Sequence, residues 1–187
     1  MAGSESAASA IISATEQWLH DVVIGLNLCP FARKPARKGA IRYAVASATD
    51  DETLMAELLH ECQLLDEQPA DALETTLLIV PGHLQSFEDF NHFLNLADWL
   101  IERHEYEGVY QLATFHPHYQ FAGTAPDDAE NLTNRAPYPI LHLLREASLT
   151  QVLESYPNPE AIPEHNIARV RGLTQAECKK LFPYLFR

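Results

Sequence analysis

Short apolar runs alternate with longer amphipathic segments in the middle of the chain, and this alternation constrains the fold more than any other feature. The runs at 41–47, 75–80 and 109–115 have the length and composition of strands. The two segments between them, residues 50–65 and 86–101, repeat apolar positions at three- and four-residue spacing, which predicts helices. A β-α-β-α-β order follows, in which each helix is long enough to return the chain for parallel pairing.

We therefore expect an α/β fold with a small parallel or mixed sheet of about three strands and extra helices at both termini. Apolar positions between about Ala8 and Gly25 predict an N-terminal helix. Pro139 fits the first turn of another helix that continues to about Ser155. The capping box Thr174-x-x-Glu177 predicts a short final helix.

The 187-residue chain is long enough to bury one core, and we expect a single domain over residues 1–187. Its hydrophobic content of 47% is too high for a disordered protein, while its longest apolar runs are too short to span a membrane. The N-terminus lacks the basic region that begins a signal peptide. The cysteines are scattered and do not form the disulfide framework of a small secreted domain. A cytoplasmic protein without a membrane partner is expected.

The net charge of −13 argues against general binding of nucleic acid. Basic residues are nevertheless concentrated in one segment, which contains Arg33, Lys34, Arg37, Lys38 and Arg42. This segment has two interpretations, a solvated surface and a patch that binds phosphate or nucleic acid.

The phrase FHPHY, at the end of the third predicted strand, contains His116 and His118. Carboxyl ends of parallel strands are the usual ligand-binding edge of an open α/β sheet. Two imidazoles there can move protons or bind a metal, and Asp128 can orient an imidazole or act as a general base. We predict that His116 and His118 share a pocket with Arg135 or Arg145.

Asn134 and Arg135 lead into the helix predicted near Pro139, whose free first-turn N–H groups would bind an anion. A carboxylate or phosphate would fit this site. On the same predicted helix, His142 and Arg145 lie away from the apolar face and are candidates for the same cleft. In the alternative, the arginines pair with nearby acids and His142 is exposed.

Cys29 lies in a turn just before the basic segment, and it has two interpretations. A thiolate stabilised by nearby cations would be a nucleophile or a redox group. A cysteine among apolar neighbours is instead a small buried hydrophobe, and here it follows Leu28 and precedes Pro30 and Phe31. We predict that Cys29 packs against the core near the start of the first strand.

Three longer motifs carry a family resemblance: GLNLCPFA at 25–32, FHPHYQFAG at 115–123 and NRAPYPILHLLREAS at 134–148. Together they resemble the bacterial family called domain of unknown function 1415, and the resemblance covers nearly the whole chain. It implies a bacterial cytoplasmic protein, but it supplies no substrate, cofactor or catalytic residue.

The leading hypothesis is an enzyme for a small anionic metabolite. Arg135 and Arg145, with Asn134, would bind the anion, and His116, His118, Asp128 and His142 would carry acid–base or metal-assisted chemistry. Two alternatives are a noncatalytic protein that binds an anion or a metal, and an acidic adaptor for a protein partner. No glycine-rich phosphate loop or nucleophile elbow is present. The sequence leaves the cofactor, the metal and the oligomeric state open.

Overall fold

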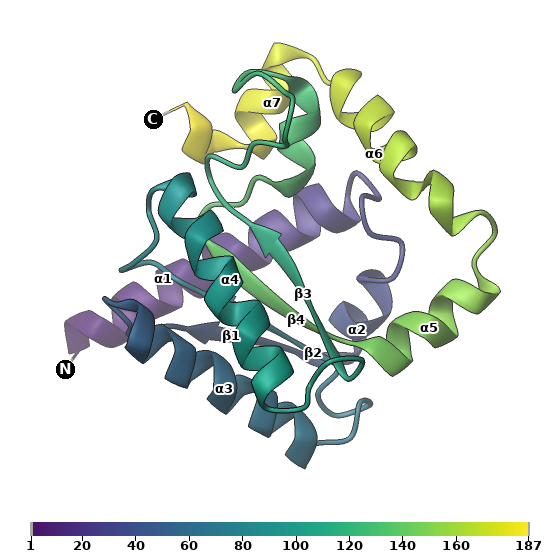
Figure 1. Cartoon of the computed structure of the whole chain (residues 1–187). Helices are drawn as coiled ribbons and strands as arrows, with labels where there is room; N and C mark the ends of the chain where they lie inside the picture. Colours follow the sequence, from purple (N-terminus) through teal and green to yellow (C-terminus); the bar gives the residue numbers. More distant parts are fainter. Residues whose placement is uncertain (1, 187) are drawn as a thin grey trace.

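The computed structural model describes residues 2–186 and places a four-stranded sheet at the centre of the chain (Figure 1). The strands are β1 (Ile41–Val45), β2 (Thr75–Ile79), β3 (Tyr110–Phe115) and β4 (Ile140–Arg145). Their order in the sheet is β1-β2-β4-β3. β1 and β2 are parallel, and β4 pairs antiparallel with both β2 and β3. The sheet is therefore mixed, with β4 inserted between two strands of the opposite direction.

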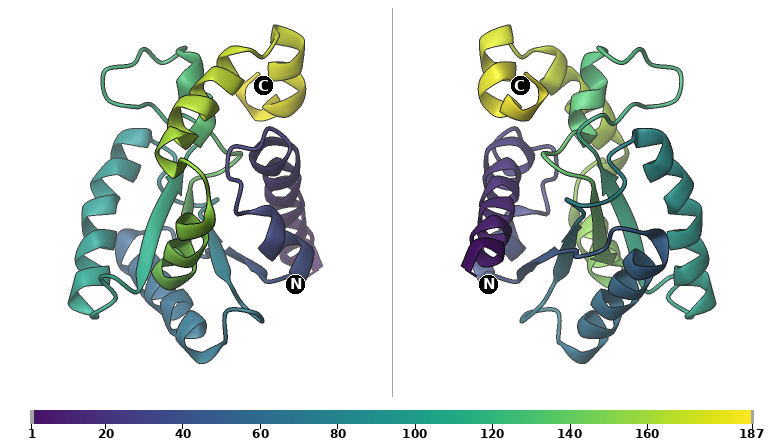
Figure 2. Two further views of the ribbon diagram at one scale, coloured as in Figure 1. Left: turned by 90° about the vertical axis from the view of Figure 1, so that its right-hand side faces the viewer. Right: turned by 90° about the vertical axis from the view of Figure 1, so that its left-hand side faces the viewer.

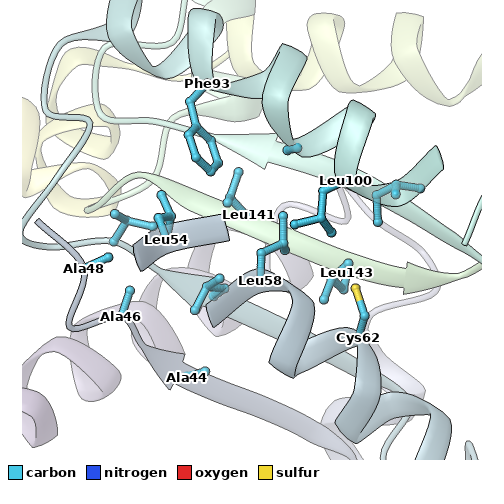
Figure 3. Close-up of a cluster of buried hydrophobic side chains, with 14 of the residues drawn as sticks. Ala44, Ala46, Ala48, Leu54, Leu58, Cys62, Phe93, Leu100, Leu141 and Leu143 are labelled. Atoms are coloured by element: carbon cyan, nitrogen blue, oxygen red, sulfur yellow. The ribbon is translucent and has the colours of Figure 1, made fainter. Parts of the chain in front are cut away.

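The predicted β-α-β-α-β order is confirmed by the two crossover helices, α3 (Asp51–Glu67) and α4 (Phe87–Arg103). The side chains of Asp50 and Ser86 cap them by accepting backbone N–H groups of the first turn. Both helices cover one face of the sheet, and Figure 3 shows their apolar side chains packed against it. The labelled side chains include Leu54, Leu58, Phe93, Leu100, Leu141 and Leu143.

The opposite face of the sheet is covered mainly by the N-terminal helix, as the two views of Figure 2 show. α1 (Ala2–Trp18) continues as a π-helical turn, η1 (Leu19–Ile24), so the predicted helix to about Gly25 is confirmed. The remaining elements are α2 (Arg33–Lys38), η2 (Ala129–Asn134), α5 (Glu146–Ser155), η3 (Pro159–Ala161), α6 (Ile162–Arg171), α7 (Gln175–Leu181) and η4 (Pro183–Leu185).

The helix predicted from Pro139 to about Ser155 is wrong in its first half, and the sheet has four strands where about three were expected. Residues 140–145 form β4, which has a strand on each side and helices over both faces. A central strand buried on both faces is apolar without alternation, so its pattern resembles that of a buried helix. Of the segment predicted to be helical, only residues from Glu146 onward form a helix, α5.

The capping box of Thr174 and Glu177 opens α7 as predicted, with both reciprocal hydrogen bonds present. No helix among residues 2–186 is long and apolar enough to cross a membrane.

Candidate functional site

The direction of the strands separates the predicted site residues into two groups. His116 and His118 follow the carboxyl end of β3, which lies at the same edge as the carboxyl ends of β1 and β2. β4 runs the opposite way, so its last residue, Arg145, pairs with the first residue of β3 at the other edge. Arg135 lies on the histidine side, where its guanidinium reaches the carbonyl of Tyr119. The structure therefore brings Arg135, and not Arg145, near the two histidines.

His116 is fully buried, and both of its ring nitrogens have partners. Nε2 lies 3.0 Å from the carbonyl oxygen of Leu84, which can only accept, so Nε2 carries the proton. Nδ1 accepts the backbone N–H of His118 at 2.9 Å. The ring contacts Phe87 and Phe90, and burial lowers its pKa to about 4. His116 is thus neutral at pH 7 and ties the end of β3 to the loop after β2.

The other predicted residues at this edge stabilise the loop between β3 and β4. Asp128 is exposed and accepts the backbone N–H of Ala125 at 2.8 Å. The side chain of Asn134 donates to the carbonyl of Thr114 at 3.0 Å. His118 is exposed. Among residues 2–186, no hydrogen bond joins the side chains of His118 and Asp128.

Arg135 connects three parts of the fold. Its guanidinium donates to the carbonyls of Tyr119 and Pro126. Its own carbonyl accepts the indole N–H of Trp18 at 3.0 Å and the hydroxyl of Tyr184 at 3.1 Å. Desolvation by burial lowers its pKa. The guanidinium is therefore held by backbone oxygens of the β3–β4 loop.

The helix end predicted to bind an anion beside Arg135 is not present. Residues 140–145 form a strand, so no free first-turn N–H groups are presented after Pro139. α5 begins at Glu146, at the opposite edge of the sheet. The premise of an anion site at that helix terminus is wrong.

A cavity of about 380 Å³ lies on the α1 side of the sheet. Residues from all four strands form its floor, and α1, η1, α2, the loop before β2, and α5 surround it. Figure 1 shows α2 and α5 beside the sheet, and residues of both helices line the cavity. The rings of Phe31, before α2, and Tyr156, after α5, are 5.3 Å apart and link these two walls. The lining is largely apolar and aromatic, including Trp18, Leu19, Phe31, Leu77, Phe115 and Leu144.

His142 is the imidazole in the cavity floor, and the structure fixes its tautomer. Its Nε2 lies 2.7 Å from Oγ1 of Thr75, and that hydroxyl donates its single proton to the carbonyl of Leu143. Oγ1 must therefore accept the Nε2–H proton. Nδ1 has no hydrogen-bond partner among the described residues. It is not one of the buried atoms left without a partner, because His142 borders the cavity. Ala113 pairs directly with His142, and its small side chain leaves room beside the ring.

His142 is partly buried in the cavity floor, where the surrounding chain removes much of the water from around its imidazole. This desolvation lowers its pKa to about 4, so the ring is neutral at pH 7. The cavity thus contains a neutral nitrogen with an available lone pair, held in place by Thr75. Such a group accepts a hydrogen bond from a ligand N–H or O–H.

Cys29 and Arg145 also line this cavity. Cys29 is partly buried and packs against the core, as predicted. Burial raises the pKa of its thiol, so the thiol form predominates at pH 7. The guanidinium of Arg145 donates to the carbonyls of Leu65, Gln68 and Leu73, which joins the end of β4 to the end of α3.

Charged side chains also line the cavity, and the exposed ones, Lys34, Lys38 and Asp71, mark its mouth. Lys34 and Lys38 reach the cavity from α2, and Asp71 and Glu74 reach it from the loop between α3 and β2. Within residues 2–186, none of these four forms an ion pair within 4.0 Å. The described residues also contain no group of three or more His, Cys, Asp or Glu side chains arranged to hold a metal.

The sequence did not identify Thr75 as part of a site, nor the aromatic wall of the cavity formed by Trp18 and Phe115. Thr75 holds His142 only because β2 pairs with β4, and residues 140–145 were predicted to be helical. Trp18 falls within the predicted N-terminal helix, and nothing in the sequence identified it as part of a cavity wall. Lys34 and Lys38 belong to the basic segment, and the concentration of charge there was the only feature of the sequence that pointed to them as candidate site residues.

These features define an α/β protein with a mixed four-stranded sheet and a largely apolar cavity beside a neutral histidine. The model of the family described as protein of unknown function (DUF1415) matches residues 10–180, and the chain belongs to this family. Comparisons with curated proteins and with solved structures found no match.

Proposed function

We propose that this protein binds a small organic molecule with a planar apolar body in the cavity, and that His142 accepts a hydrogen bond from it. The volume of about 380 Å³ lies in the range of small-molecule pockets, roughly 300–1,000 Å³. The observation that carries the proposal is the free Nδ1 of His142 in an otherwise apolar wall. A donor from a ligand gives this atom a partner in surroundings where hydrogen bonds are strong.

A planar body is favoured by the rings that form one wall. Trp18 contacts Phe115 edge to face, with ring centroids 5.0 Å apart, and Phe115 lies 6.3 Å from His142. The indole of Trp18 is fixed by its hydrogen bond to the carbonyl of Arg135. Aromatic rings prefer offset or edge-to-face contacts with other rings, and a rigid wall of this kind favours a flat ligand.

The pKa of His142 favours binding over proton abstraction. A base whose conjugate acid has a pKa of about 4 is unprotonated at pH 7 but abstracts protons poorly. This favours the noncatalytic binding protein among the functions expected from the sequence. The acid–base role considered for His116 lacks a free nitrogen, since both ring nitrogens are occupied within the fold.

The test is an NMR titration with two uncharged probes, 2-naphthol and 2-methoxynaphthalene, of which only the first has an O–H donor. The indole N–H signals report the location, because Trp18 lines the cavity and the exposed Trp99 lies on α4. We expect both probes to shift the Trp18 signal and not that of Trp99. We expect 2-naphthol to bind roughly two- to tenfold more tightly, as one neutral hydrogen bond allows.

The matched variant is His142→Phe, which keeps a ring and removes the acceptor. It should abolish the preference for 2-naphthol while 2-methoxynaphthalene still binds. If neither probe shifts the Trp18 signal, or if wild type binds both equally, the proposal is wrong.

A further inference from the structure

The short helix α2 is the most basic element next to the cavity. Its six residues are RKPARK, with four cations and no acid. None of the four forms an ion pair with another described residue. This concentration of positive charge occurs in a chain whose net charge is −13.

The four cations divide between two faces of α2. Lys34 and Lys38, four residues apart, line the mouth of the cavity. Arg33 and Arg37, also four residues apart, line a separate open hollow beside η1. Residues at this spacing share one side of a helix. The lysine pair therefore faces the cavity, and the arginine pair, about 100° around the helix, faces the separate hollow.

The stability of the helix does not account for Lys34. It lies in the first turn, where the helix dipole disfavours a cation, and it is four residues from Lys38, where like charges repel. The same holds for Arg33 and Arg37, so the lysine pair is distinguished by the cavity that it lines, where a negative group would relieve both effects.

The cavity lining also contains two acids, Asp71 and Glu74. They lie beyond ion-pair distance from the lysines, so they leave the ammonium groups available. Arg145 adds a third positive charge at the rim, although backbone carbonyls hold its guanidinium. The cavity lining thus has three cations against two acids.

We propose that the ligand is an aromatic carboxylic acid that also carries a ring O–H or N–H group. Its carboxylate lies at the mouth between Lys34 and Lys38, its rings lie against the aromatic wall, and its donor faces Nδ1 of His142. This inference rests on the proposed function, because it assigns a chemical class to the ligand of the same cavity. Flexible ammonium groups at an open mouth bind a carboxylate as point charges, with little demand on geometry. The apolar body is removed from water inside the cavity, which supplies the remaining affinity.

The experiment compares three probes that share one ring system and differ in charge: 2-naphthoate, 2-naphthamide and 2-naphthylmethylammonium. Affinities are measured at pH 7 from the Trp18 indole signal. The acid should bind most tightly and the amine least. Salt raised to about 0.5 M should weaken binding of the acid and leave the amide unchanged, because exposed charges are screened.

Two double variants that remove the same net charge separate direct contact of the lysines with the carboxylate from the overall electrostatic attraction of α2. Lys34→Gln with Lys38→Gln should weaken 2-naphthoate about five- to tenfold and leave 2-naphthamide unchanged. Arg33→Gln with Arg37→Gln should keep 2-naphthoate within about twofold of wild type, since these side chains line the separate hollow and not the cavity.

Equal binding of the acid and the amide would overturn the inference and leave the proposed function intact. An equal loss of affinity for 2-naphthoate in the two double variants would also overturn the inference. Tightest binding of the amine would overturn it too, and would indicate that Asp71 and Glu74 bind the charged group of the ligand. If none of the three probes shifts the Trp18 signal, both the inference and the proposed function fail.

Discussion

Thr75 and His142 stand on neighbouring antiparallel strands, and the threonine hydroxyl holds the imidazole through a hydrogen bond of 2.7 Å. The next residue, Thr76, has a buried hydroxyl without a hydrogen-bond partner among residues 2–186. These consecutive threonines point to opposite faces of β2, both are buried, and of the two hydroxyls only that of Thr75 has hydrogen-bond partners among the described residues. This pair provides a matched measure of what the contact to His142 contributes.

Thr75→Val should lower the free energy of unfolding by about 1–3 kcal/mol, because Nε2–H of His142 then loses its partner inside the protein. Thr76→Val should be neutral or slightly stabilising, because a buried unpaired hydroxyl is replaced by a methyl group. Urea unfolding followed by circular dichroism measures both. Equal losses in the two variants would show that the Thr75 hydroxyl has no special role.

His116 and His142 should make the free energy of unfolding depend on pH between 6.5 and 4. An unfolded histidine has a pKa of about 6.5, whereas the folded pKa values of His116 and His142 are lowered to about 4. In this window the unfolded chain binds protons that the folded chain does not. The stability from keeping these rings neutral is fully present above pH 6.5 and is lost as the pH falls toward 4.

The slope of this loss should be about 1.4 kcal/mol per pH unit for each histidine. Removing one of them in His142→Phe should reduce the slope of unfolding free energy against pH by that amount. Urea titrations of wild type and variant at pH 7, 6 and 5 measure the difference. Parallel losses in the two proteins would contradict the lowered pKa of His142.

Much of the fold could be predicted because local periodicity determines its elements. α3 and α4 have continuous helical faces with caps at Asp50 and Ser86, and β2 is a buried apolar run. The helix expected over residues 140–145 is a strand, β4, and the reason for this wrong prediction is physical. Ile140, Leu143 and Leu144 have helical spacing, yet the segment is apolar because strands and helices enclose it on every side. That environment depends on pairings remote in sequence.

The candidate site could be predicted only in part, because side-chain type says little about surroundings. His116 was chosen for its place at a strand end. In the structure its ring packs against aromatic neighbours, and backbone groups hydrogen-bond to both of its ring nitrogens, so no nitrogen is free for a ligand. His142 and Cys29 were named from the sequence and do line the cavity. The partner of His142 is 67 residues away along the chain, and no local pattern identifies it.

Arg145 should be a stabilising residue whose contribution depends on the shape of the guanidinium. Arg145→Lys removes the fork that reaches the carbonyls of Leu65, Gln68 and Leu73, and should cost about 1.5–3 kcal/mol of unfolding free energy. Arg171→Lys is the control, because Arg171 forms an exposed ion pair with Glu130 and should change stability by less than about 1 kcal/mol. Tolerance of lysine at 145 would refute this role.

Arg135→Ala should lower stability without changing any affinity for inorganic phosphate. The loss should be about 1.5–3 kcal/mol, because the carbonyls of Tyr119 and Pro126 lose a charged donor. Urea unfolding measures the first effect, and calorimetric titration with phosphate measures the second. A phosphate affinity that is present in wild type and lost in Arg135→Ala would restore the anion site predicted from the sequence.

Cys29 should react slowly with thiol reagents, and a ligand in the cavity should slow it further. The side chain is partly buried in the cavity wall, and burial raises the pKa of the thiol, so little reactive thiolate is present at pH 7. Labelling by iodoacetamide, mapped to each cysteine by mass spectrometry, should be slower than for a free peptide thiol. Saturating 2-naphthoate should slow Cys29 and leave Cys178 unchanged, because Cys178 lies on α7 outside the cavity lining. Labelling of Cys29 faster than the free peptide would instead support the nucleophile considered from the sequence, and equal protection of both cysteines would indicate that the probe acts on the whole fold.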